Sequence, residues 1–218
     1  MAGLHTERAG ADPARAKAGL VMLHGRGGSA ADILGLLDHA GLPDVAAVAP
    51  EAPGNSWWPV SFLSPSATLE PFVAAGVSAA MAAAAELEAA GLPRDRIWLL
   101  GFSQGAGLAL EAFARDGAGL AGVFGLSGGL IGTGDADGPA TDALYGHRPK
   151  RFDYAGQRAG GVWLSCHDHD PHIPMARVQE TARVLGGLGA DVETRIYPGA
   201  GHSVMREDIA AMRARLNG

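Results

Sequence analysis

Residues 97–115 of the chain read IWLLGFSQGAGLALEAFAR. The run 97–100 is continuously apolar, as a buried strand would be, and 104–115 has the composition of a buried helix. Between them lies the pattern G-x-S-x-G, with Ser103 at its centre. A serine on a sharp turn from strand to helix projects its hydroxyl above the sheet, beside the free N–H groups of the helix N-terminus. We therefore predict Ser103 as a catalytic nucleophile, with an ordinary serine helix cap as the alternative interpretation.

Apolar runs recur on both sides of this segment, and most are followed by a stretch that can form a helix. This alternation is typical of a mostly parallel central sheet with helices on both faces, because strands buried on both faces need no polar positions. The predicted strands are 19–23, 45–49, 97–100, 122–126, 161–166 and 192–197, and the predicted helices are 29–40, 69–90, 104–115, 175–188 and one from about 204.

Composition sets the expected domain boundaries. Residues 1–18 are small, polar and charged, so we predict a flexible N-terminal arm, followed by a single α/β domain over 19–218. The alternation breaks at 131–159, where glycine, proline, Asp and Arg dominate. A loop this long is usually functional or mobile. We expect no large cap domain.

Charge and hydropathy exclude several classes of protein. The net charge of −6 argues against a nucleic-acid partner. No stretch approaches the roughly 20 apolar residues of a membrane helix, and the N-terminus lacks the apolar core of a secretory signal, so we expect no integral membrane segment. Cys166 is the one cysteine, which suits a reducing compartment and predicts a cytoplasmic protein. A homodimer is compatible with the sequence.

A serine hydroxyl needs a base to take its proton, and histidine suits that task near neutral pH. His202 follows the last predicted strand, within YPGAGH (197–202), and ligands bind at this edge of open α/β sheets. A solvent-exposed loop histidine is the alternative. The acid that orients the imidazole should lie between serine and histidine in the chain. We choose Asp170, because the turn DPHIP (170–174) would fix its direction, and keep Asp168 as the fallback.

The same segment allows a rival interpretation as a metal site. Histidine and aspartate are ligands of zinc and other divalent ions. No helical H-E-x-x-H spacing supports a metal here, so we predict no metal site. The residues of this cluster are His167, Asp168, His169, Asp170 and His172.

Acyl transfer also requires donors aimed at the developing oxyanion. The backbone N–H of Gln104, directly after the serine, is one candidate. The other is the N–H of Arg26, in the glycine turn HGRGG (24–28) that follows the first predicted strand. A phosphate-binding loop is the alternative for this turn, but the G-x-x-x-x-G-K pattern is absent. Aromatic side chains in the loop 54–68 are candidates to line a substrate pocket, or plain hydrophobic anchors. They are Trp57, Trp58 and Phe62.

These motifs together resemble the phospholipase/carboxylesterase family of α/β-hydrolases, which includes acyl-protein thioesterases. The matching pieces run in order along nearly the whole chain: HGRGG at His24, GFSQGAGLAL at Gly101, GLSGGL at Gly125, DPHIP at Asp170 and YPGAGH at Tyr197. The resemblance implies an α/β-hydrolase fold, hydrolysis of carboxylic esters or thioesters without a cofactor, and a triad of Ser103, Asp170 and His202. It also implies that Arg26 and Gln104 supply the oxyanion-hole donors.

The resemblance leads to an expected activity. We predict a serine carboxylesterase that hydrolyses short- to medium-chain esters of small molecules through an acyl-enzyme. An acyl-thioesterase or lysophospholipase acting on longer chains is the alternative, followed by a metal-dependent hydrolase and a non-catalytic binding protein. Arg26 stands where acyl-protein thioesterases usually carry a large apolar residue, and Gly28 where they carry an acidic one. Arg26 at the mouth of the site would favour a substrate with a negative group.

Overall fold

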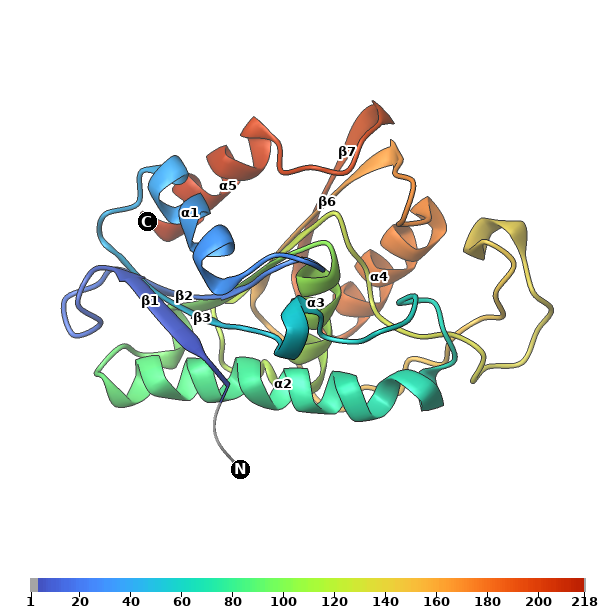
Figure 1. Ribbon diagram of the computed structural model, residues 1–218, viewed down its shortest axis with the longest axis horizontal. Helices are drawn as coiled ribbons and strands as arrows, with labels where there is room; N and C mark the ends of the chain where they lie inside the picture. The colour runs from blue at the N-terminus through green and yellow to red at the C-terminus, as the bar shows by residue number, and fades with distance from the viewer. Residues whose placement is uncertain (1–3, 218) are drawn as a thin grey trace.

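The structure is a computed structural model and describes residues 4–217. Its strands form one seven-stranded sheet in the order β1-β3-β2-β4-β5-β6-β7 (Figure 1). All neighbouring strands are parallel except β1 and β3. Every strand predicted from an apolar run is present, within a few residues at each end. The strands are β1 Thr6–Gly10, β2 Ala18–Leu23, β3 Val45–Pro50, β4 Ile97–Phe102, β5 Gly122–Leu126, β6 Gly161–His169 and β7 Asp191–Ala200.

Helices cover both faces of this sheet, as predicted (Figure 1). On one face lie α1 (Ala30–Ala40) and α5 (Arg206–Leu216), which contact each other. On the other face α2 (Ser66–Ala89) packs along α3 (Gln104–Asp116), with α4 (Met175–Gly187) over β6 and β7. Single turns of 3₁₀ helix occur at Pro53–Asn55, Arg94–Arg96 and Asp142–Leu144.

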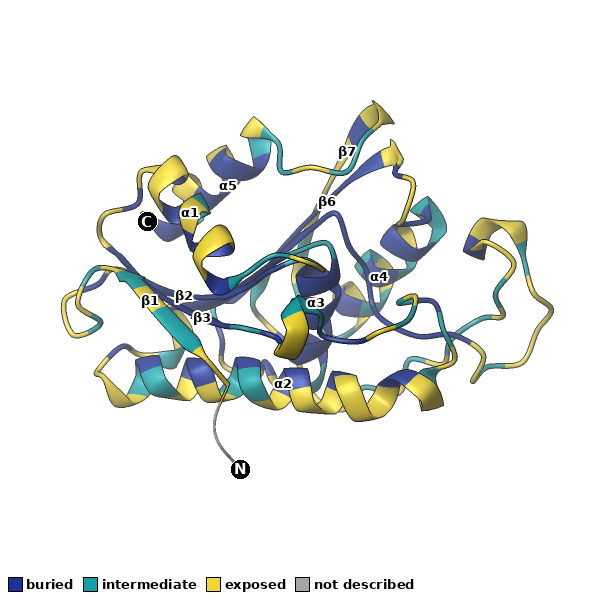
Figure 2. Cartoon of the chain, viewed as in Figure 1, coloured by how far each residue is buried: buried dark blue, intermediate teal, exposed yellow. Residues whose placement is uncertain are grey.

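The sheet separates two apolar cores, because successive side chains of a strand point to opposite faces. In β2, Leu20 and Met22 pack under α1 and α5, whereas Val21 and Leu23 pack against α2 and α3. Both pairs are fully buried, and β2, β3 and β5 are buried along their whole length, as is β4 up to its last residue, Phe102 (Figure 2). This two-sided burial is why these strands read as continuous apolar runs in the sequence.

The prediction of a flexible arm over residues 1–18 is wrong for part of that segment. Thr6–Gly10 forms β1, which pairs antiparallel with β3 from Thr6 opposite Pro50 to Gly10 opposite Ala46. Its sequence TERAG has no apolar alternation, since β1 is an edge strand whose residues are half-buried or exposed. Arg8 also forms an ion pair with Glu86 of α2, with Nε and Oε1 2.5 Å apart. Residues 1–3 lie outside the described part of the chain.

Helix α2 corresponds to the predicted helix 69–90 and begins three residues earlier, but its hydropathy, high enough for a membrane helix, was not predicted. By length and composition alone it is the one helix in residues 4–217 apolar enough to cross a membrane. In the fold it packs on the strands β2, β3 and β4. Its inward side chains are buried, from Leu69 through Val73 and Val77 to Leu87. This contact with the sheet accounts for the apolar side of the helix.

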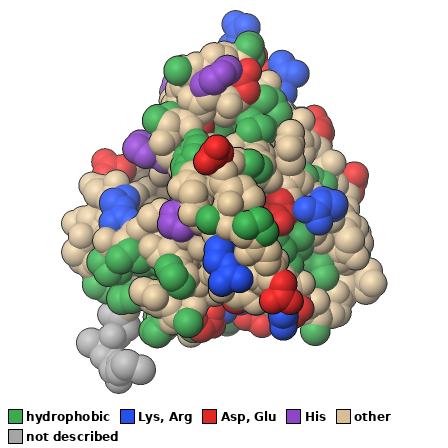
Figure 3. All heavy atoms as spheres, turned by 90° about the vertical axis from the view of Figure 1, so that its right-hand side faces the viewer, with side chains coloured by type: hydrophobic (Ala, Val, Ile, Leu, Met, Phe, Trp, Pro, Cys, Tyr) green, Lys and Arg blue, Asp and Glu red, His purple; other side chains and the backbone are tan. Residues whose placement is uncertain are grey.

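The segment 131–159 is attached to α3 through a buried carboxylate. Glu111 is fully buried and accepts hydrogen bonds from the Lys150 ammonium at 2.8 Å and the Tyr154 hydroxyl at 2.9 Å. Burial alone would raise the pKa of Glu111, but the charges of Lys150 and Arg115 and the hydrogen bonds outweigh it and hold the pKa below its usual value. The segment forms one end of the molecule, where acidic and basic side chains are interspersed (Figure 3).

One glycine of α1 offers a test of helix stability. Gly35 lies within the helix, and a Cβ built there meets no atom within 4 Å. Alanine loses less backbone entropy than glycine in a helix. We therefore expect Gly35→Ala to raise the free energy of unfolding by about 0.5–1 kcal/mol. Urea denaturation followed by circular dichroism measures this change, and a destabilised variant would contradict the prediction.

Candidate active site

Ser103 lies on a strained turn between β4 and α3. Its backbone has φ 55° and ψ −116°, a region that non-glycine residues rarely adopt. The turn is possible because its flanking glycines leave room for close backbone approach. A Cβ at Gly101 would lie 2.0 Å from the Gly105 carbonyl oxygen, and one at Gly105 would lie 2.0 Å from the Leu23 carbonyl oxygen. The glycines of the G-x-S-x-G motif are therefore required by space.

The structure brings Ser103, His202 and Asp170 together in one hydrogen-bonded chain. The Nε2 atom of His202 lies 2.8 Å from the Ser103 Oγ, and its Nδ1 atom lies 2.7 Å from Oδ2 of Asp170. The three residues come from the ends of three different strands, β4, β6 and β7, or from the loops that follow them. His202 is also packed between the Phe102 ring, with centroids 5.1 Å apart, and the edge of His172 at 4.9 Å.

Asp170 is fixed by the turn that the sequence suggested. Its Oδ1 accepts the backbone N–H groups of His172 at 2.8 Å and Ile173 at 3.1 Å, and its Oδ2 faces His202 and also accepts the Cys166 thiol, with Sγ 3.5 Å away. Burial opposes ionisation of this carboxyl, but the hydrogen bonds from His202 and the two N–H groups outweigh it, so the pKa of Asp170 lies below its usual value. Tyr145, in the 131–159 segment, donates its hydroxyl to the Asp170 carbonyl oxygen at 3.0 Å.

This lowered pKa makes stability depend on pH. A carboxyl whose folded-state pKa is depressed contributes stability above its unfolded pKa of about 3.9 and loses it as pH falls through the folded value. We expect Asp170→Asn to unfold more easily than wild type at pH 7, and the difference to shrink below about pH 4. Urea unfolding at several pH values tests this expectation. A difference that stays constant down to pH 2.5 would contradict it.

The rest of the predicted acid and histidine cluster is dispersed. Asp168 is exposed and turned away from His202: its Oδ1 lies 2.6 Å from His169 Nδ1 and accepts the Gly199 N–H at 2.7 Å. The side chain of His169 is 77% exposed, whereas His167 is buried against Tyr197, with ring centroids 5.4 Å apart. The fallback acid and the rival metal site therefore lack the geometry they require.

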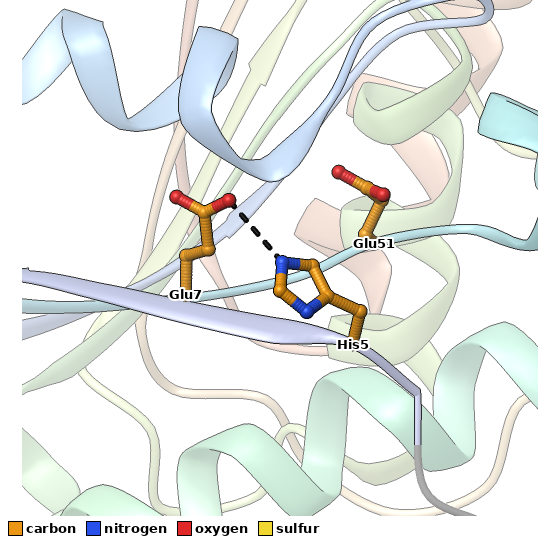
Figure 4. Close-up of side chains that lie close together, drawn as sticks. All are labelled: His5, Glu7 and Glu51. Atoms are coloured by element: carbon orange, nitrogen blue, oxygen red, sulfur yellow. Dashed lines mark hydrogen bonds and ion pairs between the residues drawn. The ribbon is translucent and has the colours of Figure 1, made fainter.

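A different trio of possible metal ligands occurs on the edge of the sheet. His5, Glu7 and Glu51 offer ligand atoms that lie within 4.8 Å of one another (Figure 4). His5 Nε2 is 3.2 Å from Glu7 Oε1, and Glu51 accepts the Ala30 N–H at the start of α1. The carboxylate of Glu51 is thus already used as a helix cap. None of the three lines the cleft beside Ser103.

A cleft of about 660 Å³ opens above Ser103. Its lining is mostly apolar and glycine-rich, and Arg26 is the one lining side chain with a full charge among the described residues. In residues 4–217, the backbone N–H groups of Arg26 and Gln104 have no backbone acceptor. Both predicted oxyanion donors, Arg26 and Gln104, line the cleft. Other lining residues are Phe102, Gly128, His172 and His202.

Two of the three predicted aromatic lining residues face the cleft. Trp58 and Phe62 line it, whereas Trp57 does not and lines a neighbouring apolar pocket instead. Consecutive residues of an extended segment point in opposite directions. The indole of Trp57 instead packs on His24, with ring centroids 5.3 Å apart, and donates its N–H to the His24 carbonyl oxygen at 2.9 Å.

The side chain of Gln104 makes contacts that were not predicted from the sequence. Its role in the prediction was confined to the backbone N–H, but its amide is buried and reaches the loop that carries Trp57 and Trp58. Oε1 accepts the Trp57 N–H at 2.9 Å, and Nε2 donates to the Trp58 carbonyl oxygen at 2.9 Å. These partners lie 46 and 47 residues away in the chain, beyond the reach of any local pattern.

Comparison with known proteins connects this geometry to a family. Residues 8–141 match the family model described as phospholipase/carboxylesterase. Acyl-protein thioesterase 1 of Gibberella zeae is 32% identical over 126 residues, which cover 58% of this chain and 49% of that protein. The chain thus spans about half the length of this curated relative.

Solved structures match over the whole chain. A phospholipase/carboxylesterase from Dyadobacter fermentans has 33% sequence identity and a TM-score of 0.86, and the match covers 100% of this chain and 99% of that one. The esterase PE8 is similar at 25% identity and a TM-score of 0.75, with 99% and 98% covered. With the sheet order, the strained serine turn and these matches taken together, the chain belongs to the phospholipase/carboxylesterase family and has its α/β-hydrolase fold.

Proposed function

We propose that this protein is a serine esterase that hydrolyses carboxylic esters through an acyl-enzyme on Ser103. The observation that carries the proposal is the chain of contacts from Ser103 Oγ through His202 to Asp170, at 2.8 and 2.7 Å, below an open cleft. Hydrogen-bonded serine, base and orienting acid form the arrangement that activates a hydroxyl for acyl transfer.

In the first step, Ser103 Oγ attacks the ester carbonyl carbon while His202 Nε2 takes the hydroxyl proton. The carbonyl oxygen becomes an oxyanion, which accepts hydrogen bonds from the backbone N–H groups of Arg26 and Gln104. The bond to the alcohol oxygen then breaks, and the alcohol leaves with the proton that His202 carries. Ionised Asp170 holds Nδ1 protonated and stabilises the imidazolium.

The second step reverses the roles with water. His202 removes a proton from a water molecule, which attacks the acyl carbon, and the same oxyanion donors stabilise the intermediate. The bond to Ser103 Oγ breaks, the serine regains its proton from His202, and the carboxylic acid leaves. Neither step of this proposed reaction uses a cofactor.

The two-step mechanism is tested by following the first turnover. Mixing with p-nitrophenyl acetate in a stopped-flow instrument should give a burst of p-nitrophenol stoichiometric with enzyme if deacylation is the slower step. Acid quenching followed by peptide mass spectrometry should find the acetyl group on Ser103. An acetyl group on another residue would refute the proposal.

The preferred length of the acyl chain can be determined by comparing substrates. The cleft is walled by Trp58 and Phe62, which supports short- to medium-chain esters. A neighbouring apolar pocket of about 800 Å³ shares Trp58 and Pro59 with the cleft and supports the alternative, an acyl-thioesterase or lysophospholipase that takes longer chains. Activity on p-nitrophenyl esters from acetate to palmitate separates the two: an optimum at or below octanoate favours the esterase.

Arg26 suggests a preference for substrates with a negative group. Its guanidinium is exposed at the rim of the cleft and donates from Nη2 to the Val60 carbonyl oxygen at 2.5 Å. We expect Arg26→Met to lower kcat/KM for an ester with a terminal carboxylate about three- to tenfold more than for a neutral ester of equal length. The backbone N–H remains in this variant.

Two controls separate charge from structure in this experiment. Arg26→Lys should keep most of the preference, and high salt should reduce the preference of the wild-type protein because the cation is exposed. An equal loss on both substrates in Arg26→Met would refute selection by charge and leave Arg26 as a support for the Val60 loop.

A further inference from the structure

Residues 52–60, here termed the bridging loop, connect two parts of the site that are far apart in the sequence. At one end the loop is held by the side chain of Gln104, which is only 7% exposed. The amide binds the loop as a neighbouring strand would: Oε1 accepts the Trp57 N–H and Nε2 donates to the Trp58 carbonyl oxygen, both at 2.9 Å. Nε2 also lies 3.4 Å from the Ser56 hydroxyl.

The bridging loop also binds His24, the first residue of the turn 24–28, through Ala52 and Trp57. The Ala52 N–H donates to His24 Nε2 at 3.0 Å, so the imidazole proton lies on Nδ1 and is donated to the Gly25 carbonyl oxygen at 2.7 Å. The Trp57 indole N–H donates to the His24 carbonyl oxygen at 2.9 Å. His24 is buried and bonded to the bridging loop through both its ring and its carbonyl oxygen, so we expect a shift of the loop to move the turn 24–28.

Further hydrogen bonds continue along the turn. The Gly27 N–H donates to the Asn55 carbonyl oxygen at 2.7 Å, and the Asn55 amide donates to the Gly28 carbonyl oxygen at 2.9 Å. Arg26 donates from its guanidinium to Val60. Except for the Gly28 N–H, which donates to the Gly25 carbonyl oxygen, the hydrogen bonds described for this turn run to the bridging loop or within the His24–Gly25 pair.

This turn needs external support. Arg26 has glycine on both sides, and Gly27 adopts φ 80° with open space around it. Glycine has the largest conformational freedom of any residue. Arg26 also lies outside β2, so no sheet hydrogen bond fixes its backbone. The Gln104 N–H, by contrast, is fixed by the start of α3.

We propose that the side chain of Gln104 is a positioning residue, which sets the separation of the Arg26 and Gln104 N–H groups through the bridging loop. The inference rests on the proposed function, in which these two groups stabilise the oxyanion. If a donor moves away from the oxyanion, the enzyme stabilises the transition state less, whereas its binding of the substrate changes little. Glutamine suits the task because it supplies an acceptor and a donor on one planar group, to match the N–H and C=O of the loop.

The test removes the amide and keeps the backbone donor. Gln104→Met has similar volume, and we expect its kcat on p-nitrophenyl butyrate to fall about 10- to 100-fold with KM changed less than about threefold. A trifluoromethyl ketone with the same acyl chain adds to Ser103 as a hemiketal whose oxyanion occupies the hole. Its inhibition constant should rise by a factor similar to the fall in kcat/KM.

Two further variants keep the inference falsifiable. Trp57→Phe removes the indole donor to His24 and part of the buried ring but keeps an aromatic ring there, and it should lower kcat about three- to tenfold, even if Gln104→Met folds poorly. Thr133→Val is the matched control: Thr133 is buried and donates its hydroxyl to the Leu63 carbonyl oxygen, just beyond the bridging loop. It should lower the melting temperature and leave kcat within twofold.

The outcomes distinguish the inference from the proposal on which it depends. If the ketone fails to inhibit wild type, or if it inhibits Ser103→Ala equally, the serine mechanism is wrong and the inference falls with it. If the ketone inhibits wild type but binds Gln104→Met and Trp57→Phe unchanged, the serine mechanism stands and the positioning role is refuted. A fall in kcat for Thr133→Val equal to that of Gln104→Met would also refute it.

Discussion

Ser103→Ala should lower kcat for p-nitrophenyl butyrate by about 10³- to 10⁶-fold, the range found when a serine nucleophile is removed. The Oγ atom of Ser103 is the only side-chain hydroxyl within hydrogen-bonding distance of His202 among the described residues, so no other serine, threonine or tyrosine described there is placed to replace it. KM and the melting temperature should stay near wild type, since alanine fits the same space. Steady-state kinetics and thermal denaturation measure the two effects.

Ser127→Ala is the control for backbone strain. Ser127 has φ 52°, close to the 55° of Ser103, and it is buried at the end of β5. Its replacement changes the same side chain at a similarly strained position but does not touch His202. Activity within twofold of wild type is expected. If Ser103→Ala kept a tenth of the wild-type activity, the triad would be refuted, and sensitivity to a chelator would then test for a metal-dependent reaction.

The sheet could be predicted from the sequence because burial of the central strands on both faces leaves a strong local signal. Residues 97–100 and 122–126 are apolar without interruption, and both runs correspond to strands in the structure. The edge strand Thr6–Gly10 has no such signal, because its partner Val45–Pro50 supplies hydrogen bonds to its backbone and not burial to its side chains. Edge pairing of this kind depends on tertiary structure and is not encoded in a local pattern.

The site was predictable to the extent that its geometry is local. Ser103 is held by a turn whose glycines are visible in the motif, and Asp170 by two N–H groups that follow directly in the chain. The sequence alone left Asp168 open, since both acids follow the predicted strand 161–166. Only the structure shows that Asp168 lies within β6 and is bonded to His169 and Gly199.

The missed features depend on contacts across the chain. Trp57 and Trp58 are chemically identical neighbours, and which of them faces the cleft depends on where Gln104 binds the loop backbone. The buried carboxylate of Glu111 likewise forms its ion pair with Lys150, which lies 39 residues away in the chain. A one-dimensional pattern contains no information on either pairing.

Gly105→Ala should destabilise the protein strongly. An alanine Cβ would lie 2.0 Å from the Leu23 carbonyl oxygen and 2.6 Å from that of His24, and these are backbone atoms that cannot rotate away. Either α3 or the end of β2 must move, which separates Ser103 from the turn that carries Arg26. We expect a loss of about 3–5 kcal/mol in the free energy of unfolding, and little folded protein at 37 °C.

Gly35→Ala is the control for the steric clash expected in Gly105→Ala, because it makes the same substitution at a position with free space. Gly35→Ala adds an identical methyl group to a helix and meets no atom, so its expected stabilisation shows what alanine does without a clash. Any folded Gly105→Ala protein should also lose esterase activity out of proportion to its stability, because one proposed oxyanion donor, Gln104, lies at the start of α3 and the other, Arg26, in the turn that follows β2. A Gly105→Ala variant with wild-type melting temperature and activity would mean that strand β2 and helix α3 do not approach as closely as the serine turn requires.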